Sequence, residues 1–198
     1  QNLYLSFDHG RQCVDCQATA IKNATMINFV GERFLREVVN DYFMDRPIIP
    51  PSVREEVKAK YQYGAARAII NAPASNMYPE NCPHLVRTYG VEDEILAAKE
   101  ENCREFQRRL GLNIDPGAIL FYWPSRLDPF QRGVELLEAI ARDFVDAYSD
   151  VQIAIVGDGV GSDRTHVDIL GRIAYTSGGR IAYHPFTESL SMLGYAAA

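Results

Sequence analysis

Apolar residues fill positions 119–123 without interruption, and a polar turn and a helical pattern follow them. A run this short cannot span a membrane, but it is typical of a strand that is buried on both faces, as in a parallel sheet. The apolar residues after the turn repeat at helical spacing: Val134, Leu137, Ile140, Ala141, Phe144, Val145 and Tyr148. Strand, turn and helix together predict the beginning of a βαβ unit.

The same alternation recurs twice downstream. Residues 151–156 (VQIAIV) predict a second buried strand, and residues 180–186 (RIAYHPF) predict a third. A helix that starts at Ser162 or Asp163 separates the two strands, and Thr187 caps a final helix. This order predicts an α/β fold with a Rossmann-like, doubly wound parallel sheet. Right-handed crossovers then bring all three strand-to-helix turns to one edge of the sheet.

Shorter patterns occupy the first part of the chain. They predict helices at 17–23, 34–43 and 52–61 and strands at 25–30 and 67–70. Ser52 and Glu55 have the spacing of a capping box for the third of these helices.

Proline and asparagine cluster in residues 71–83, where no periodicity survives. We therefore expect a linker there and two domains, residues 1–75 and residues 76–198. In the second domain, Asp93 is placed to cap a further helix that Gly111 ends.

Composition and charge exclude several classes of protein. The chain has 198 residues, of which 47% are hydrophobic and 23% charged, and this predicts a globular protein with a real core. The net charge of −6 argues against a nucleic-acid or anionic-membrane surface. We find neither a spanning segment nor a secretion signal, and we expect a cytoplasmic location. The absent initiator methionine and the uncapped last helix indicate a piece of a longer protein.

The four cysteines do not predict a disulfide scaffold, because they are few and scattered in a chain of this length. Cys13 and Cys16 form a CxxC pair, but no second pair at zinc-finger spacing accompanies it. Zinc binding or redox chemistry at this pair is the weaker alternative to two reduced thiols. We assign no metal site.

Two arginines in the turn after residues 119–123 are the first candidates for chemistry. Arg126 follows the strand and Arg132 opens the helix, at the edge where open α/β sheets bind ligands and where a helix amino end favours an anion. Forked, charge-assisted hydrogen bonds from both could hold a diphosphate. The alternative is that Arg126 pairs with Asp128 or another carboxylate and that Arg132 is a solvated surface residue.

The glycines after residues 151–156 offer a dinucleotide-binding alternative. Gly157, Gly159 and Gly161 begin a glycine-rich turn, but the G-x-G-x-x-G fingerprint needs glycine at position 162, where the chain has serine. An NAD or FAD site is therefore the weaker interpretation. Phe186, at the end of the third strand, could stack on a nucleotide base, although an aromatic residue at such a position is more often part of the core.

These residues resemble a known family. The segment FYWPSRLDPFQRGVELLEAIA is similar to the nucleotide-binding loop of glycogen and starch synthases, which contains an R-L-x-x-Q-K-G motif. The likeness continues through VQIAIVGDG and RIAYHPFTESLSMLGYAAA, and upstream through INFVGERFLREV and INAP. The resemblance covers most of the chain after about residue 20, and the loop around Arg126 is its most specific part.

The resemblance implies a fold and a function. Such enzymes have the GT-B fold of two Rossmann-like domains, and they transfer glucose from ADP- or UDP-glucose to the end of an α-glucan with retention of configuration. They need neither a metal nor another cofactor. Residues 1–75 would be the carboxyl part of the acceptor-side amino domain. Residues 76–198 would be the nucleotide-sugar-binding domain, truncated at its end.

The resemblance also implies roles for five residues. Arg126 and Arg132 match the arginine and lysine that hold the donor phosphates, and Gly133 matches the glycine of the motif. Phe186 matches an aromatic residue against the nucleotide base, and Asn71 matches an asparagine near the donor. The chain departs from the family in having arginine in place of lysine and a spacing one residue longer. The phosphate contact therefore keeps its charge but changes its shape.

Two motifs of the family are absent from the sequence. The lysine and glycine motif would precede Gln1, and a pair of glutamates would follow Ala198. We therefore assign no catalytic residue and expect these 198 residues to be inactive alone. The alternatives are another GT-B enzyme, such as a sucrose-phosphate synthase or a lipid-sugar transferase, and a non-catalytic nucleotide-binding Rossmann module with zinc at Cys13 and Cys16.

Overall fold

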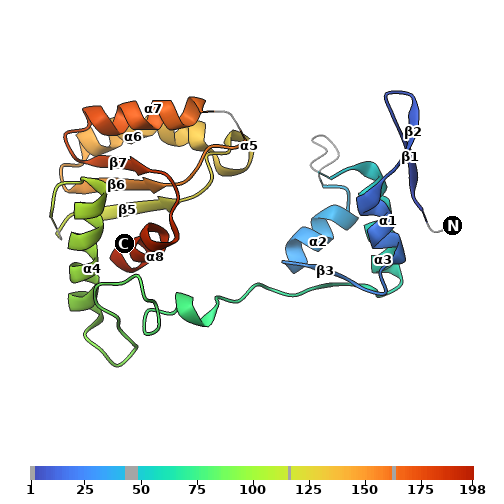
Figure 1. The fold of residues 1–198 in the computed structure, drawn as a ribbon, viewed down its shortest axis with the longest axis horizontal. Coiled ribbons are helices and arrows are strands. Elements are labelled where there is room, and N and C mark those ends of the chain that lie inside the picture. The colour runs from blue at the N-terminus through green and yellow to red at the C-terminus, as the bar shows by residue number, and fades with distance from the viewer. Residues whose placement is uncertain (1–2, 43–48, 116, 162–163) are drawn as a thin grey trace. The chain divides into compact units, whose positions relative to one another are not determined.

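The computed structural model describes residues 3–42, 49–115, 117–161 and 164–198. Within it the chain divides into two compact units, Gln1–Ala72 and Pro73–Ala198, and Figure 1 labels the elements of both. Identification of the two units with the two domains of a GT-B enzyme stays a prediction.

Three positions named in the sequence analysis lie outside the described residues. They are Phe43, the expected end of a helical stripe, and Ser162 and Asp163, the expected beginning of a helix.

The first unit is a small α/β arrangement. Its elements are β1 (Leu5–Asp8), β2 (Arg11–Val14), α1 (Cys16–Asn23), β3 (Ile27–Phe29), α2 (Glu32–Val39), α3 (Pro51–Gln62) and β4 (Ala66–Ala68). β3 and β4 pair in parallel, and buried Leu35, Val38 and Val57 belong to the core of this unit. The three helices and two strands that we expected between residues 17 and 70 are therefore present, with altered ends.

Two features of the first unit differ from expectation. β1 and β2 form an antiparallel hairpin that the sequence pattern did not predict, with His9 and Gly10 at positive φ in its turn. The capping box is wrong, because Pro50 is the N-cap residue of α3 and makes no side-chain cap bond. Ser52 lies inside the helix, and its hydroxyl donates to the carboxylate of Asp15 at 2.5 Å.

The second unit contains the predicted parallel sheet. Its elements are η1 (Ser75–Met77), α4 (Ile95–Leu110), β5 (Ile119–Pro124), α5 (Pro129–Arg132), α6 (Val134–Ala147), β6 (Val151–Val156), α7 (Thr165–Thr176), β7 (Ile181–His184) and α8 (Glu188–Ala197). The strand order is β5-β6-β7, and both pairs are parallel. Helices α6 and α7 lie on one face, and α4 and α8 lie on the other (Figure 1). The doubly wound α/β fold class is confirmed.

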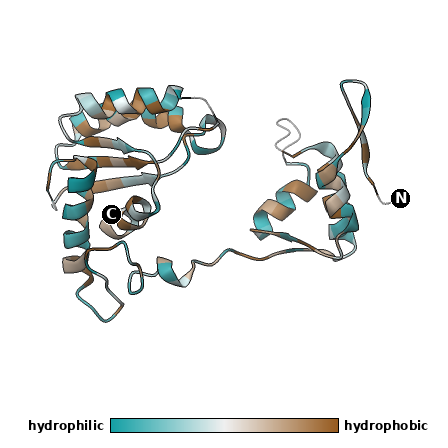
Figure 2. Cartoon of the chain, in the orientation of Figure 1, coloured by the Kyte–Doolittle hydropathy of each residue, from teal (hydrophilic) through white to brown (hydrophobic). Residues whose placement is uncertain are grey.

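The central strand β6 separates two hydrophobic cores. Ala154 and Val156 face the core that includes Phe106 of α4. Ile153 and Ile155 face the core shared with α6 and α7. All six residues of β6 are buried, and Figure 2 shows the hydrophobic strands between helices whose polar residues are on the outside. Because β6 pairs with both β5 and β7, it also positions the turns that follow these two strands.

The first strand of the sheet is less buried than its sequence indicated. Ile119 and Phe121 of β5 are 53% and 49% exposed, so the expectation of burial on both faces is wrong. The reason is its position: in the described residues β5 pairs only with β6 and lies at an edge. The ring of Phe121 packs against Phe144 with 5.4 Å between centroids, which covers only part of this strand.

Of the two capping predictions for α4, one is wrong and one is confirmed. The residue before the helix is Glu94, which makes no side-chain cap bond, so the assignment of Asp93 as the cap is wrong. The carboxylate of Asp93 instead accepts the N–H of Gly90 at 2.7 Å. At the other end, Gly111 has a φ of 72° and ends the helix as predicted.

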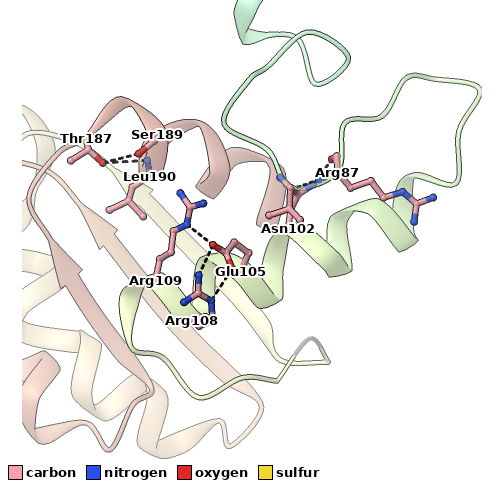
Figure 3. Close-up of polar contacts among 9 residues, drawn as sticks. Arg87, Asn102, Glu105, Arg108, Arg109, Thr187, Ser189 and Leu190 are labelled. Carbon is pink, nitrogen blue, oxygen red and sulfur yellow. Dashed lines mark hydrogen bonds and ion pairs between the residues drawn. The ribbon is translucent and has the colours of Figure 1, made fainter.

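Figure 3 shows polar contacts within α4 and at the beginning of α8. Thr187 caps α8 as predicted, because its hydroxyl accepts the N–H of Leu190 at 3.3 Å. On α4, Glu105 accepts hydrogen bonds from Arg108 and Arg109. Three hydrogen bonds, two from Arg108 and one from Arg109, lower the pKa of Glu105 to about 2. In the described part of the chain, no helix is long and apolar enough to cross a membrane.

Candidate nucleotide site at the edge of the sheet

Backbone hydrogen bonds connect the three strand-to-helix turns of the second unit. The N–H of Ser125 donates to Val156 at 3.2 Å, and the N–H of Leu127 donates to Asp158 at 2.9 Å. The N–H of Gly157 donates to His184 at 3.1 Å. The turns after β5, β6 and β7 are therefore joined side by side, as the crossover rule predicted.

At Gly157 the turn after β6 approaches the turn after β5 closely. A Cβ atom at this position would lie 1.8 Å from the carbonyl oxygen of Ser125, which leaves no space for any side chain. The carbonyl of Gly157 accepts the hydroxyl of Tyr183 at 3.0 Å. Burial raises the pKa of Tyr183, which keeps this hydroxyl protonated as a donor. The glycine thus allows the backbones of two turns to approach closely.

A hollow of about 560 Å³ opens where the turns meet. Its lining combines cationic, acidic and aromatic side chains with backbone from all three turns and with two residues of α8. The lining residues are Pro124, Ser125, Arg126, Arg132, Val156, Gly157, Asp158, Phe186, Ser191 and Tyr195. The structure therefore brings together three of the five residues chosen from the sequence: Arg126, Arg132 and Phe186.

Arg126 is exposed at the hollow and is held by a weak contact. Its guanidinium donates to the side-chain oxygen of Gln131 at 3.4 Å, and Asp128 accepts the backbone N–H of the same Gln131 at 3.1 Å. Among the residues that the structure describes, no carboxylate lies within ion-pair distance of Arg126 or Arg132. The alternative in which Arg126 is neutralised by Asp128 is thus not what the structure shows.

Arg132 is positioned by the short helix α5 and the glycine after it. Its backbone N–H donates to the carbonyl of Asp128 at 2.9 Å, which closes this turn. Gly133 then adopts a φ of 68° as the N-cap of α6, a conformation that residues other than glycine rarely adopt. Gly133 is not part of the lining of the hollow, and its proposed phosphate contact stays a prediction.

Phe186 belongs to the turn after β7 and lines the same hollow. The side chain is 53% exposed, which favours a surface available to a ligand over the core position that we considered as its alternative. Its backbone N–H donates to the carboxylate of Asp158 at 3.1 Å. Stacking of this ring on a base stays a prediction.

Among the lining residues that were not chosen from the sequence, three contribute polar side chains from outside the Arg126 turn. Asp158 belongs to the turn after β6, while Ser191 and Tyr195 come from α8. Ser191 and Tyr195 are four residues apart and share one face of a helix, which is the only local signal for them. The ring of Tyr195 packs on Tyr122 of β5 with 5.4 Å between centroids.

Other candidate residues belong to the first unit or to no cluster. Asn71 is exposed at the end of the first unit, and its contact with a donor stays a prediction. The thiol of Cys13 lies 3.2 Å from the hydroxyl of Ser6, and the thiol of Cys16 donates to the carbonyl of Val14 at 3.8 Å. The described residues contain no group of three or more histidine, cysteine or acidic side chains arranged to hold a metal ion.

Comparison with known proteins shows relatives of one kind. No protein-family model matches the chain. The glycogen synthase of Nitrosospira multiformis is 36% identical over 91 residues, which are 46% of this chain and 17% of the relative. The glycogen synthase of Clostridium botulinum is 28% identical over the whole of this chain and 38% of the relative. The chain thus spans well under half the length of these relatives.

The fold has a counterpart among solved structures. The catalytic domain of starch synthase IV from Arabidopsis thaliana, bound to ADP and acarbose, superposes with a TM-score of 0.72 at 20% identity. The match covers 96% of this chain and 36% of the other. The chain is therefore similar in sequence to glycogen synthases over part of their length, and it has part of the GT-B glycosyltransferase fold of this starch synthase.

Proposed function

We propose that residues 73–198 bind the nucleoside diphosphate part of ADP- or UDP-glucose. In this proposal the chain is the donor-binding portion of a retaining glucosyltransferase that extends an α-1,4-glucan. The observation that carries the proposal is the pair of arginines, Arg126 and Arg132, in one hollow at the carboxyl edge of a parallel sheet.

The charge of the hollow favours a diphosphate. The protein as a whole carries a net charge of −6, yet two guanidinium groups lie here without a carboxylate partner among the described residues. Unpaired guanidinium groups donate strong, forked hydrogen bonds to phosphate oxygens. The short turn through Gly133 places Arg132 beside the amino end of α6, whose dipole adds to the attraction.

The comparisons support the identity of the ligand. The relatives are named glycogen synthases, and the starch synthase that shares the fold is described as bound to ADP. We extend this ligand class to the present chain because the arginines and Phe186 supply an anion site and an aromatic surface in one hollow.

We assign an electrostatic role to the two arginines. When the bond between glucose and the diphosphate breaks, negative charge grows on the departing diphosphate. Fixed cations at that position stabilise the transition state more than the bound donor. We assign neither a metal nor a cofactor to this step, and the α-glucan acceptor is a proposal that rests on the relatives alone.

Calorimetric titration of the 198-residue chain with ADP, UDP and NAD tests the proposal. We expect saturable binding of ADP or UDP at low salt, and Arg126→Ala or Arg132→Ala should weaken it about tenfold or more, because each removes a charge-assisted hydrogen bond. Increasing the salt concentration should weaken it further.

The matched control is Arg104→Ala. Arg104 lies on α4 in an exposed pair with Glu100 at 3.4 Å, so its loss changes the net charge equally without touching the hollow. Binding to this variant should stay within about twofold of the wild type, since exposed ion pairs contribute little. Preference for NAD, or equal nucleotide affinity in Arg126→Ala, would contradict the proposal.

A further inference from the structure

Asp158 belongs to the middle one of the three turns that line the hollow, for a reason of topology. It follows β6, the central strand, so its turn lies between the turn that carries Arg126 and the turn that carries Phe186. Two hydrogen bonds fix it there. Its backbone carbonyl accepts the N–H of Leu127 at 2.9 Å, and its carboxylate oxygen Oδ1 accepts the N–H of Phe186 at 3.1 Å.

The second carboxylate oxygen of Asp158 is available. Within the described ranges Oδ2 has no hydrogen-bond donor, and the side chain is exposed to the hollow. A negative charge at this place opposes the binding of a diphosphate by Arg126 and Arg132, because like charges repel. A hydrogen bond from another part of the ligand to this oxygen would offset that repulsion.

The order of the three side chains matches the order of groups in a nucleotide. A nucleoside diphosphate presents its phosphates at one end, its base at the other and its ribose between them. The hollow presents cations on one turn, the ring of Phe186 on another and the carboxylate of Asp158 on the turn between. A ribose hydroxyl can donate a hydrogen bond, and a carboxylate oxygen accepts such a bond readily. Acidic residues bind the ribose in this way in dinucleotide sites.

We propose that Oδ2 of Asp158 accepts a ribose hydroxyl and makes the site selective for ribonucleoside over deoxyribonucleoside diphosphates. This inference rests on the proposed function, because it concerns the same hollow and the same ligand. Asp158 is then a specificity residue: it contributes through the sugar and not through the phosphates.

Titrations with ADP, 2′-deoxy-ADP, 3′-deoxy-ADP and inorganic pyrophosphate test the inference. For the wild-type chain we expect ADP to bind about tenfold more tightly than at least one deoxy analogue, which corresponds to about 1.4 kcal/mol. In Asp158→Asn this ratio should fall below about threefold. Pyrophosphate should bind to the variant as tightly as to the wild type or more tightly, because a repelling charge is gone.

Asp158→Asn is chosen because its side-chain oxygen can still accept the N–H of Phe186. The hydrogen bond between the two turns is therefore kept. The control is Asp150→Asn, which removes the same charge at the opposite end of β6, where the backbone carbonyl of Asp150 accepts the N–H of Ile119. The control should keep the wild-type ratio.

Three outcomes would overturn the inference. If the wild type binds all three nucleotides equally, or if Asp158→Asn keeps the tenfold ratio, Asp158 only ties the turn of Phe186. In both cases Arg126-dependent binding of ADP would still support the proposed function. If no nucleotide binds to the wild type, the inference and the proposed function fail together.

Discussion

Replacement of Gly157 by alanine should disrupt the edge of the sheet where the hollow lies. The added methyl would lie 1.8 Å from the carbonyl oxygen of Ser125 and 2.8 Å from its carbonyl carbon. Non-bonded heavy atoms prefer about 3.5 Å or more, so the two turns must separate by more than about 1 Å. Neither contact can be relieved by rotation of a side chain, because both atoms of Ser125 belong to the backbone.

The expected cost follows from the bonds that this separation breaks. The hydrogen bonds from Ser125 to Val156 and from Leu127 to Asp158 both join the turn after β5 to the turn after β6. Loss of each costs about 1 kcal/mol, and the strain of inserting a methyl group into packed structure adds about 1–3 kcal/mol. We therefore expect a loss of about 3 kcal/mol or more, which lowers the melting temperature of a unit of this size by about 10 °C.

Thermal unfolding followed by circular dichroism measures this loss, and amide exchange at Leu127 reports whether the turn has opened. The control is Gly171→Ala in α7, where an added Cβ atom meets no heavy atom within 4 Å outside the local helix backbone. That variant should be as stable as the wild type or gain up to about 1 kcal/mol of helix propensity. A Gly157→Ala protein that melts within about 2 °C of the wild type and protects Leu127 equally would refute the steric argument.

Two further substitutions test the packing and charge of the helices. In α8, the Cβ atom of Gly194→Ala would lie 2.5 Å from the ring of Tyr122. We expect the free energy of unfolding, measured with denaturant, to fall by about 2 kcal/mol. An unchanged unfolding midpoint would show that the ring moves freely. Glu105 has its pKa lowered to about 2 by hydrogen bonds from Arg108 and Arg109. The folded-state pKa is below the unfolded value. The ionised Glu105 therefore contributes to the free energy of unfolding above about pH 4.5, and this contribution is lost as the pH falls towards 2. Melting curves should show that wild type is more stable than Glu105→Gln by about 1 kcal/mol at pH 6. This difference in stability should shrink as the pH falls to 2.5. A difference that grows on acidification would contradict the lowered pKa of Glu105.

Local signals were sufficient for much of the second unit. The run at 151–156 is bounded by turn residues and became β6 without change of bounds. Gly111 and Thr187 end and begin their helices as predicted, because a left-handed residue and a capping hydroxyl act within one turn of the chain. The position of Arg126 and Arg132 at the sheet edge followed from strand order and crossover handedness.

Signals that depend on tertiary neighbours were not sufficient. A continuous apolar run predicts burial, yet Ile119 and Phe121 are exposed because β5 lies at an edge of the described sheet. The hairpin of β1 and β2 escaped notice because its turn uses His9 and Gly10 in place of the common Asn-Gly.

The site shows the same limit. Asp158 lies in a glycine-rich turn of the sequence, and the position of its turn between the Arg126 turn and the Phe186 turn depends on which strand is central. Tyr195 is far from the Arg126 turn in the sequence and reaches the hollow through the packing of α8 on β5. No motif in the sequence places either residue at the hollow.

The most direct test of the proposed site is a crystal structure of this chain soaked with ADP. We predict that the diphosphate lies between the guanidinium groups of Arg126 and Arg132, with the base on the ring of Phe186 and the ribose beside Asp158. Nucleotide bound on another face of the second unit, with both arginines turned away from its phosphates, would contradict it.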